Sequence, residues 1–329
     1  MKLACFENVD LLRPRLAGVA PDPGPDYYPV PLTPELDLER DDYTLICITP
    51  NSRINRAVLE RLDRLELIVT TSTGFDHIDP LACQERGVRV ANVPLWAEHA
   101  VAEHVFALLL ALARRLEPAV SRVRKGDLGL AGLEGFELFG RTLGVIGTGT
   151  IGREVIRIAR GFGMEVLGFD LRPEPNQAGR LGFRYVGLED LLTGSEVVTL
   201  HLPAGPETHH LIGRKEIGMM RPGAVIINTS RGENLDTAAL LEGLEKGRLA
   251  GAGLDVWEEL EGVGLAPGQE REKDPLTARL LGREEVILTP HSAWFTTEAK
   301  ERVFDSAAET IKAFVRGEYL NPVDFPGPV

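Results

Sequence analysis

Residues 143–170 read LGVIGTGTIGREVIRIARGFGMEVLGFD, and they set the fold of the chain. An apolar run at 143–146 leads into three glycines, Gly147, Gly149 and Gly152, and a segment with helical spacing of apolar residues follows. A second apolar run then ends at Asp170. The stretch predicts a strand, a tight turn, a helix and a second strand.

Each glycine has its own task in such a unit. Gly147 permits the tight turn, Gly149 lets backbone N–H groups approach a diphosphate, and Gly152 lets the helix pack close to the strand. Thr150 and Ile151 begin the helix, so the diphosphate would lie beside them at the positive end of the helix dipole. A purely structural glycine turn is the alternative interpretation.

Asp170 stands 23 residues after Gly147, close to the spacing at which a carboxylate accepts the ribose hydroxyls of a dinucleotide. A carboxylate there repels a 2′-phosphate, so the sequence favours NAD over NADP as cofactor. Arg172 could weaken that preference.

Composition limits the partners. The chain has 329 residues, enough for about two domains, and a formal net charge of −13. Phosphate backbones need a basic face, so we expect no nucleic-acid partner. The cysteines stand singly, the N-terminus has no signal-peptide pattern, and the longest apolar run, 105–113, is too short to cross a bilayer. We therefore expect a cytoplasmic protein without membrane association.

Short apolar runs alternate with helical segments along the whole chain, a pattern typical of parallel sheets covered by helices on both faces. We expect a proline-rich loop at 21–34 and a long helix at 97–116, buried between domains or in a subunit contact. The final helix should return to the first domain. The predicted strands are 2–7, 45–49, 67–70, 88–93, 196–202, 224–228, 249–256 and 285–289.

Three strand ends carry groups suited to a small anionic substrate. Thr73 and Gly74 follow the strand at 67–70, where backbone N–H groups could meet a carboxylate, although a plain turn is the alternative. Arg231 follows the strand at 224–228 and can fork two hydrogen bonds onto a carboxylate. His291 follows the strand at 285–289 and can move a proton near neutral pH. Together with a hydride carrier, these groups can interconvert a 2-oxo acid and a 2-hydroxy acid.

Histidines and carboxylates near the start of the long helix invite comparison with a metal site. His99 and Glu103 share a helix face, but no third ligand completes the set, so we expect packing or hydrogen-bonding roles and no metal.

The motifs then combine into a resemblance. VIGTGTIG at 145–152, STGFDHID at 72–79, LHLP at 200–203, INTSRG at 227–232, GLDVW at 253–257 and TPHSAW at 289–294 resemble D-isomer-specific 2-hydroxyacid dehydrogenases. VPLWAEHAVAEH at 93–104 and the long insert before TPHSAWFTTEA look most like the D-lactate dehydrogenase branch.

The resemblance implies an α/β fold of two doubly wound parallel-sheet domains. One is a flavodoxin-like substrate domain, 1–99 plus 292–329, and the other is a Rossmann NAD-binding domain, 100–291. It also implies that Arg231 binds and polarises the substrate, that His291 is the acid/base and that Thr73 and Gly74 hold the carboxylate. The residues implied to line the cofactor, beyond the glycine turn and Asp170, are His201, Pro203, Thr208, Thr229, Asp255 and Ala293.

Members of the family pair the histidine with a glutamate five residues after the aspartate, and this chain has Leu260 there. Glu261, which would fit if the loop carries one extra residue, is preferred over Glu259 as the partner of His291. If neither carboxylate reaches His291, the enzyme should be slow or its pH optimum should shift towards acid.

Trp96 and Trp294 stand where the branch often has a smaller aromatic ring. They would either restrict the substrate pocket or pack at the domain boundary. The resemblance also suggests a homodimer. A nicotinamide-sensing protein on the same scaffold, or a dehydrogenase of another small anion, is the alternative to a 2-hydroxyacid dehydrogenase.

Overall fold

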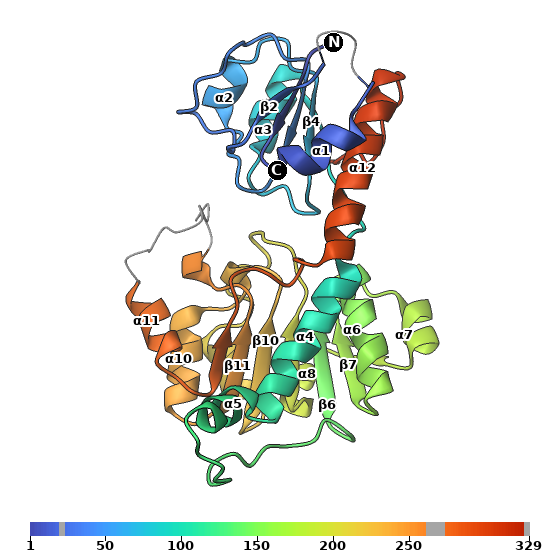
Figure 1. Cartoon of the computed structure of the whole chain (residues 1–329). Helices are drawn as coiled ribbons and strands as arrows, with labels where there is room; N and C mark the ends of the chain where they lie inside the picture. The colour runs from blue at the N-terminus through green and yellow to red at the C-terminus, as the bar shows by residue number, and fades with distance from the viewer. Residues whose placement is uncertain (20–23, 261–273, 326–329) are drawn as a thin grey trace. The chain divides into compact units, whose positions relative to one another are not determined.

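The computed structural model describes residues 1–19, 24–260 and 274–325. The chain divides into two compact units, each with its own parallel sheet (Figure 1). Unit 1 comprises Met1–Ala97 and Thr296–Val329, and unit 2 comprises Glu98–Phe295. The unit limits differ by a few residues from the boundaries expected at 99 and 292. The reason is that helix α4 (Glu98–Ala113) and helix α12 (Thr297–Val315) each begin at a limit.

The sheet of unit 1 has the order β2-β1-β3-β4-β5, the flavodoxin-like arrangement. Every residue of β1, β3 and β4 is buried, as expected for a parallel sheet covered on both faces. The strands are β1 (Leu3–Phe6), β2 (Asp26–Tyr28), β3 (Leu45–Ile48), β4 (Leu67–Thr70) and β5 (Arg89–Ala91), and the helices besides α12 are α1 (Val9–Arg15), α2 (Arg56–Glu60) and α3 (Pro80–Arg86).

Strand β2 corrects the prediction of a loop throughout 21–34. The strand has only three residues, and tertiary contacts hold it rather than a local pattern. Tyr28 stacks on Phe6 with ring centroids 4.9 Å apart, and its hydroxyl lies 2.7 Å from that of Tyr43. A sequence pattern of period two cannot show contacts of this kind.

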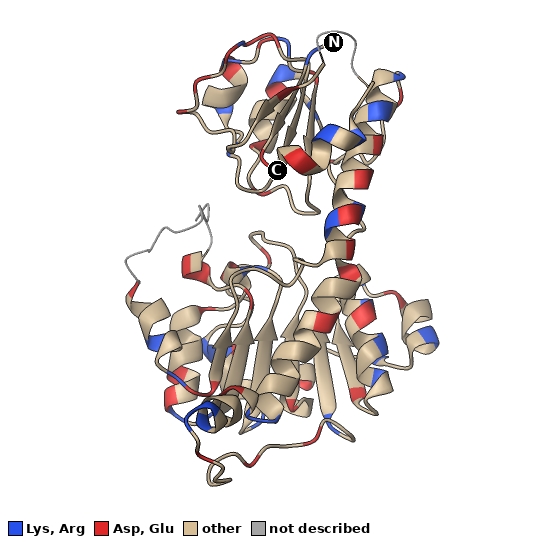
Figure 2. Ribbon diagram, viewed as in Figure 1, with Lys and Arg blue, Asp and Glu red and all other residues tan. Residues whose placement is uncertain are grey.

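The sheet of unit 2 has the order β12-β11-β10-β9-β6-β7-β8. From β6, the strands β7 and β8 are added on one side of the sheet and β9 to β12 on the other. In such sheets, dinucleotides bind at the crevice where the strand order reverses, which here lies between β6 and β9. Strands β6, β9 and β10 contain no charged residue and form part of the tan interior in Figure 2. The strands are β6 (Thr142–Ile146), β7 (Glu165–Phe169), β8 (Arg184–Tyr185), β9 (Val197–Leu200), β10 (Ala224–Asn228), β11 (Leu249–Leu254) and β12 (Val286–Leu288).

Helices cover both faces of this sheet (Figure 1). The expected sets of helices and parallel strands are present, so the predicted fold class of two doubly wound domains is confirmed. The helices besides α4 are α5 (Leu116–Arg124), α6 (Thr150–Gly161), α7 (Pro175–Leu181), α8 (Leu188–Gly194), α9 (Arg214–Met219), α10 (Thr237–Glu245) and α11 (Pro275–Leu281), with 3₁₀ turns at Gly232–Asn234 and Glu258–Leu260.

The long helix predicted at 97–116 is shorter in the structure, where it ends at Ala113. Helix α4 packs against α6 and strands β10, β11 and β12 inside unit 2, so its apolar surface is covered by its own unit. Arg115, in the left-handed backbone region with φ 49°, separates it from α5. Helix α5 has no buried residue.

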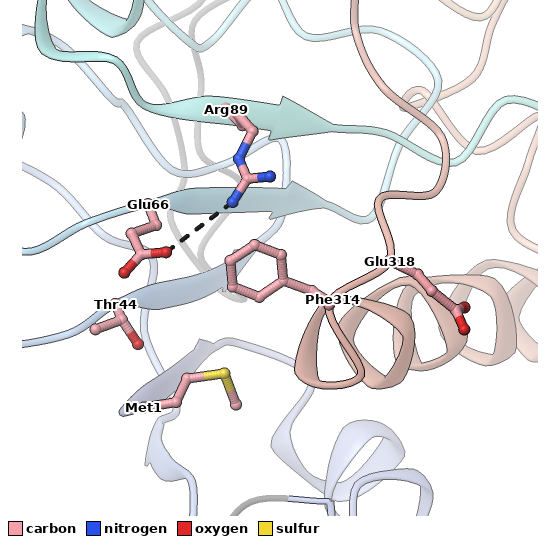
Figure 3. Close-up of a pocket in the computed structure, with 7 residues that line it drawn as sticks. Met1, Thr44, Glu66, Arg89, Phe314 and Glu318 are labelled. Carbon is pink, nitrogen blue, oxygen red and sulfur yellow. Dashed lines mark ion pairs between the residues drawn. The ribbon is translucent and has the colours of Figure 1, made fainter.

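No helix in the described part of the chain is long and apolar enough to cross a bilayer. A cavity of about 380 Å³ lies at the amino ends of the unit 1 strands (Figure 3). Arg89 lies 4.0 Å from Glu66 there and stacks over the ring of Phe314. Thr73 and Gly74 lie at the opposite end of the strands, because they follow the carboxyl end of β4.

Candidate active site

The glycine turn after β6 has the geometry that a dinucleotide unit requires. Gly147 has φ 91°, and a Cβ on Gly152 would lie 2.1 Å from the carbonyl oxygen of Gly147. By contrast, a Cβ on Gly149 would have no atom within 4 Å, so open space lies beside this residue. Gly149 is the N-cap of α6 and no side chain caps the helix, which leaves its first N–H groups for an anion.

Asp170 is tied to the same turn. Its Oδ2 accepts hydrogen bonds from the backbone N–H of Thr148 at 2.7 Å and from the Thr148 hydroxyl at 3.0 Å. Its Oδ1 accepts one from the N–H of Arg172 at 2.9 Å. The carboxylate is therefore fixed at the carboxyl end of β7 and keeps acceptor capacity for the ribose hydroxyls.

The residues expected to line the cofactor differ in whether their polar side-chain groups already form hydrogen bonds within the protein. Burial lowers the pKa of His201 to about 3, so its ring is neutral, and Nε2 lies 3.0 Å from the Thr199 hydroxyl. The Thr208 hydroxyl donates to the carbonyl of Pro203 at 2.8 Å. The buried Thr229 hydroxyl has no hydrogen-bond partner among the described residues. That orphaned hydroxyl, the open space at Gly149 and the uncapped α6 fit a dinucleotide.

A hydrogen-bonded turn presents Arg231. Asn228 Oδ1 accepts from the N–H of Ser230 at 3.0 Å and from its hydroxyl at 2.8 Å, while Asn228 Nδ2 donates to the Arg231 carbonyl at 2.8 Å. Gly232 follows, and a Cβ on it would lie 2.3 Å from the carbonyl carbon of Trp257. Only glycine allows this turn to approach the segment after β11 so closely.

Asp255 holds the loop that carries His291. Its carboxylate is fully buried and accepts hydrogen bonds from the hydroxyl of Thr289 at 2.6 Å and from the N–H groups of Ser292 and Ala293, each at 2.9 Å. The Asp255 carbonyl accepts from the N–H of His291 at 2.9 Å. His291 itself has φ 50°, an uncommon value for a residue other than glycine.

Three influences set the charge of His291. The protein atoms around the ring disfavour its charged form and lower its pKa, the carboxylate of Asp255 raises the pKa, and the guanidinium of Arg231 lowers it. The net pKa lies below the ordinary value. Arg231 and His291 are therefore close enough within unit 2 to interact through their charges.

Glu258 and Glu259, which follow Trp257, both accept hydrogen bonds from Thr237. Glu258 lies 2.6 Å from Nε2 of His210 and accepts from the N–H of Thr237 at 2.8 Å. Glu259 accepts from the Thr237 hydroxyl at 3.2 Å, and burial raises its pKa. Glu261, the preferred partner of His291, lies outside the described residues. Among the described residues, Asp255 is the carboxylate that hydrogen-bonds to the His291 loop.

The turn at Thr73 and Gly74 lies in unit 1. No hydrogen bond among the described residues uses the N–H of either residue, so both can serve a ligand. The hydroxyl of Thr73 accepts from the indole N–H of Trp96 at 3.0 Å and donates to the Val93 carbonyl at 2.9 Å. Trp96 is buried and supports the turn from behind.

Trp294 belongs to unit 2. It is half-buried, and its ring meets that of Phe295 edge to face at 5.2 Å. The structure therefore assigns the two tryptophans to different units, Trp96 as support for Thr73 and Trp294 as part of the loop after His291.

One group of potential metal ligands occurs among the described residues, and it consists of His209, His210 and Glu258. The imidazole rings of the two histidines stack with centroids 4.1 Å apart at 28°. Their lone pairs lie in the ring planes and so do not converge on one ion. The hydrogen bond with Glu258 raises the pKa of His210, which marks an ion pair.

A family model described as D-isomer specific 2-hydroxyacid dehydrogenase, NAD binding domain, matches residues 106–293. The chain belongs to this family. Glyoxylate reductase of Thermococcus litoralis is 38% identical over 81% of this chain and 78% of its own length. D-lactate dehydrogenase of Escherichia coli is 36% identical over 83% of this chain and 84% of its own.

A solved structure of D-lactate dehydrogenase from Aquifex aeolicus, complexed with NAD and lactic acid, has a TM-score of 0.89. It is 33% identical, and the match covers 99% of this chain and 100% of that one. The resemblance noted from the motifs is thereby confirmed. This D-isomer-specific 2-hydroxyacid dehydrogenase family member is an NAD-dependent oxidoreductase acting on 2-hydroxy acids.

The sequence motifs did not single out two residues that contact the loops of Arg231 and His291. His104 is one of them, because its Nε2 lies 3.0 Å from the Thr289 hydroxyl and 3.5 Å from Asp255 Oδ1. Asn228 was noted only as the last residue of a strand. The pattern of a buried asparagine before Thr-Ser-Arg-Gly was the available signal for it.

Proposed function

We propose that this protein reduces 2-oxo acids to D-2-hydroxy acids, with NADH as the hydride donor. The observation that carries the proposal is the pairing in unit 2 of Arg231 with His291 on a loop fixed by Asp255. A permanent cation after β10 and a titratable donor after β12, at the same end of one sheet, are what reduction of a 2-oxo acid requires.

In this mechanism, Arg231 binds the substrate and polarises its carbonyl group. The free N–H groups of Thr73 and Gly74 hold the carboxylate. Protonated His291 donates its proton to the carbonyl oxygen as that oxygen gains negative charge. When bound, the reduced nicotinamide supplies the hydride. In the oxidative direction, neutral His291 takes the proton from the hydroxyl group.

For the cofactor, the proposal assigns the diphosphate to the glycine turn at 147–152 and the start of α6, and the adenosine ribose to Asp170. The open space at Gly149 and the fixed position of the carboxylate support this assignment. His201, Pro203, Thr208, Thr229, Asp255 and Ala293 line the rest of the site, where the orphaned Thr229 hydroxyl gains a partner.

The test is NADH oxidation by purified protein with a panel of 2-oxo acids, glyoxylate and pyruvate first. We expect turnover with at least one member, and a loss of about 10²–10⁴-fold in kcat for His291→Gln, the usual contribution of proton transfer. His99→Gln is the matched control, because His99 is exposed and pairs with Glu154. An active His291→Gln variant would contradict the assignment.

We also infer that the protein is a homodimer, and that helix α5 and the residues after it form the contact. Leu116, Val120 and Val123 repeat at i, i+4 and i+7, so they make one apolar stripe on α5, and they are exposed together with Leu128 and Leu130. An isolated helix of this length is marginal in water, so a second copy covering it is the natural source of stability.

A cytoplasmic location is the last part of this proposal. The support is that Cys5, Cys47 and Cys83 are all buried and unpaired as disulfides, a state typical of reducing compartments.

A further inference from the structure

Glu7 lies on the same edge of the unit 1 sheet as Thr73 and Gly74. It directly follows β1, which pairs with β3, and β3 pairs with β4. The N–H of Thr71 donates to the carbonyl of Ile48, so the segments after β3 and β4 also lie side by side. The three strand ends run in sequence from Glu7 to the turn that is free to bind a carboxylate.

The carboxylate of Glu7 is held in place by its neighbours. One oxygen accepts a hydrogen bond from the hydroxyl of Thr49, and the other accepts one from Nδ2 of Asn51 at 3.0 Å. Both partners follow β3, so the Glu7 side chain extends towards β3 and the turn beyond it. The Glu7 backbone has φ 56°, a left-handed value that a glutamate rarely adopts.

This half-buried carboxylate has no ion pair with a basic residue in the described part of the chain, although many exposed acids of this protein do. Each of its oxygens can accept at least one more hydrogen bond. The hydrogen bonds from Thr49 and Asn51 fix this negative charge without neutralising it. Its natural partner is a positive group supplied by a ligand.

We propose that Glu7, with Thr49 and Asn51, recognises a cationic group at the far end of the substrate side chain. The preferred substrates are then 2-oxo and 2-hydroxy acids that carry an amino or guanidino group. Strands lie about 4.8 Å apart, so β1 is roughly 10 Å from β4, and the Glu7 side chain spans part of that gap. A substrate chain of about three to five atoms bridges the remainder. This inference rests on the proposed function, because it uses the carboxylate anchor at Thr73 and Gly74.

The experiment compares oxidation by NAD of D-2-hydroxy-6-aminohexanoate with that of D-2-hydroxyheptanoate, which has a chain of equal length and a neutral end. We expect kcat/KM to be at least about tenfold higher for D-2-hydroxy-6-aminohexanoate than for D-2-hydroxyheptanoate, the usual effect of a charged hydrogen bond. Glu7→Gln keeps the size and hydrogen-bonding capacity of the side chain, and it should remove this preference while leaving the neutral substrate within about twofold.

Glu60→Gln is the matched control. Glu60 is exposed at the end of α2, and its substitution changes the net charge by the same amount. Glu7→Lys should reverse the preference and favour D-2-hydroxyadipate. Thermal unfolding of every variant, compared with the unsubstituted protein, shows whether the fold is retained.

The outcomes separate the two proposals. Oxidation of the neutral acid without any preference for the cationic one, or an equal loss for both in a folded Glu7→Gln, overturns the role of Glu7 alone. If no 2-hydroxy acid of any charge is oxidised, the proposed function itself fails.

Discussion

At the residue scale, the charge of His291 decides the direction in which the reaction runs best. Because the pKa of His291 lies below the ordinary value, the imidazole is neutral in most molecules at pH 7. Reduction needs the protonated ring, so kcat/KM for a 2-oxo acid should rise as pH falls through neutrality and level off below the lowered pKa. Oxidation should show the opposite limb. Steady-state profiles in both directions between about pH 5 and 9 would test this, and a reduction limb centred above 6.5 would contradict it.

The charge of Asp255 raises the pKa of His291, so removing this charge should lower that pKa further. Asp255→Asn should move the reduction limb further towards acid, since the carboxylate is the influence that raises the pKa of His291. Thr289→Val is the control, because it deletes one hydrogen bond to Asp255 and keeps the charge. If both variants lose activity with the same pH profile as the original protein, Asp255 only braces the loop.

Asp170 should set the choice between the two nicotinamide cofactors. Asp170→Asn keeps the size of the side chain and removes the charge that repels a 2′-phosphate. We expect the ratio of kcat/KM for NADPH to that for NADH to rise roughly tenfold, which corresponds to about 1.4 kcal/mol. Glu189→Gln, an exposed acid on α8, is the control for net charge. An unchanged ratio would remove Asp170 from the ribose site.

At the scale of one element, the turn between β6 and α6 separates stability from cofactor binding. Gly152→Ala places a methyl group 2.1 Å from the Gly147 carbonyl oxygen, and it should cost about 1–3 kcal/mol of unfolding free energy. Gly149→Ala meets no atom, so it should change stability by less than about 1 kcal/mol and yet weaken NADH binding. Calorimetry and fluorescence titration would measure both quantities. Normal NADH affinity in Gly149→Ala would mean that the diphosphate does not lie there.

The same turn shows which features of the structure can be predicted from the sequence. The glycine spacing predicted the β6–α6 unit because the strand, the turn and the helix follow one another directly in the chain. The network around Asp255 was not predictable, since its partners stand 34 to 38 residues later in the chain. For the same reason the motifs indicated Arg231 and His291 as candidates, while the roles of Asn228 and His104 needed the coordinates. Strand β2 escaped because aromatic contacts rather than a strand pattern hold it.

At the scale of the whole molecule, the chain length and the family resemblance predicted two domains, and the alternation of strands and helices predicted their parallel sheets. The sequence did not indicate which surface a second copy would use. The long apolar helix suggested a subunit contact, but α4 is covered by its own sheet. Helix α5 exposes Leu116, Val120 and Val123 instead, at 53%, 40% and 59% of their accessible surface. Charged and apolar residues are interspersed in α5, so its sequence does not indicate a contact surface. The structure shows that these three side chains remain exposed.

Two charges in that stripe should therefore separate the subunits. We expect the unsubstituted protein to sediment as two copies of the 36.0 kDa chain, and Val120→Asp with Val123→Asp to sediment as one. Buried carboxylates without partners are costly, so the doubly substituted dimer would lose several kcal/mol. Leu281→Asp, on the exposed face of α11, is the matched control and should remain dimeric. A monomer before any substitution, at micromolar concentration, would contradict the proposed contact. A dimer that survives both charges would place the contact on another surface of the protein.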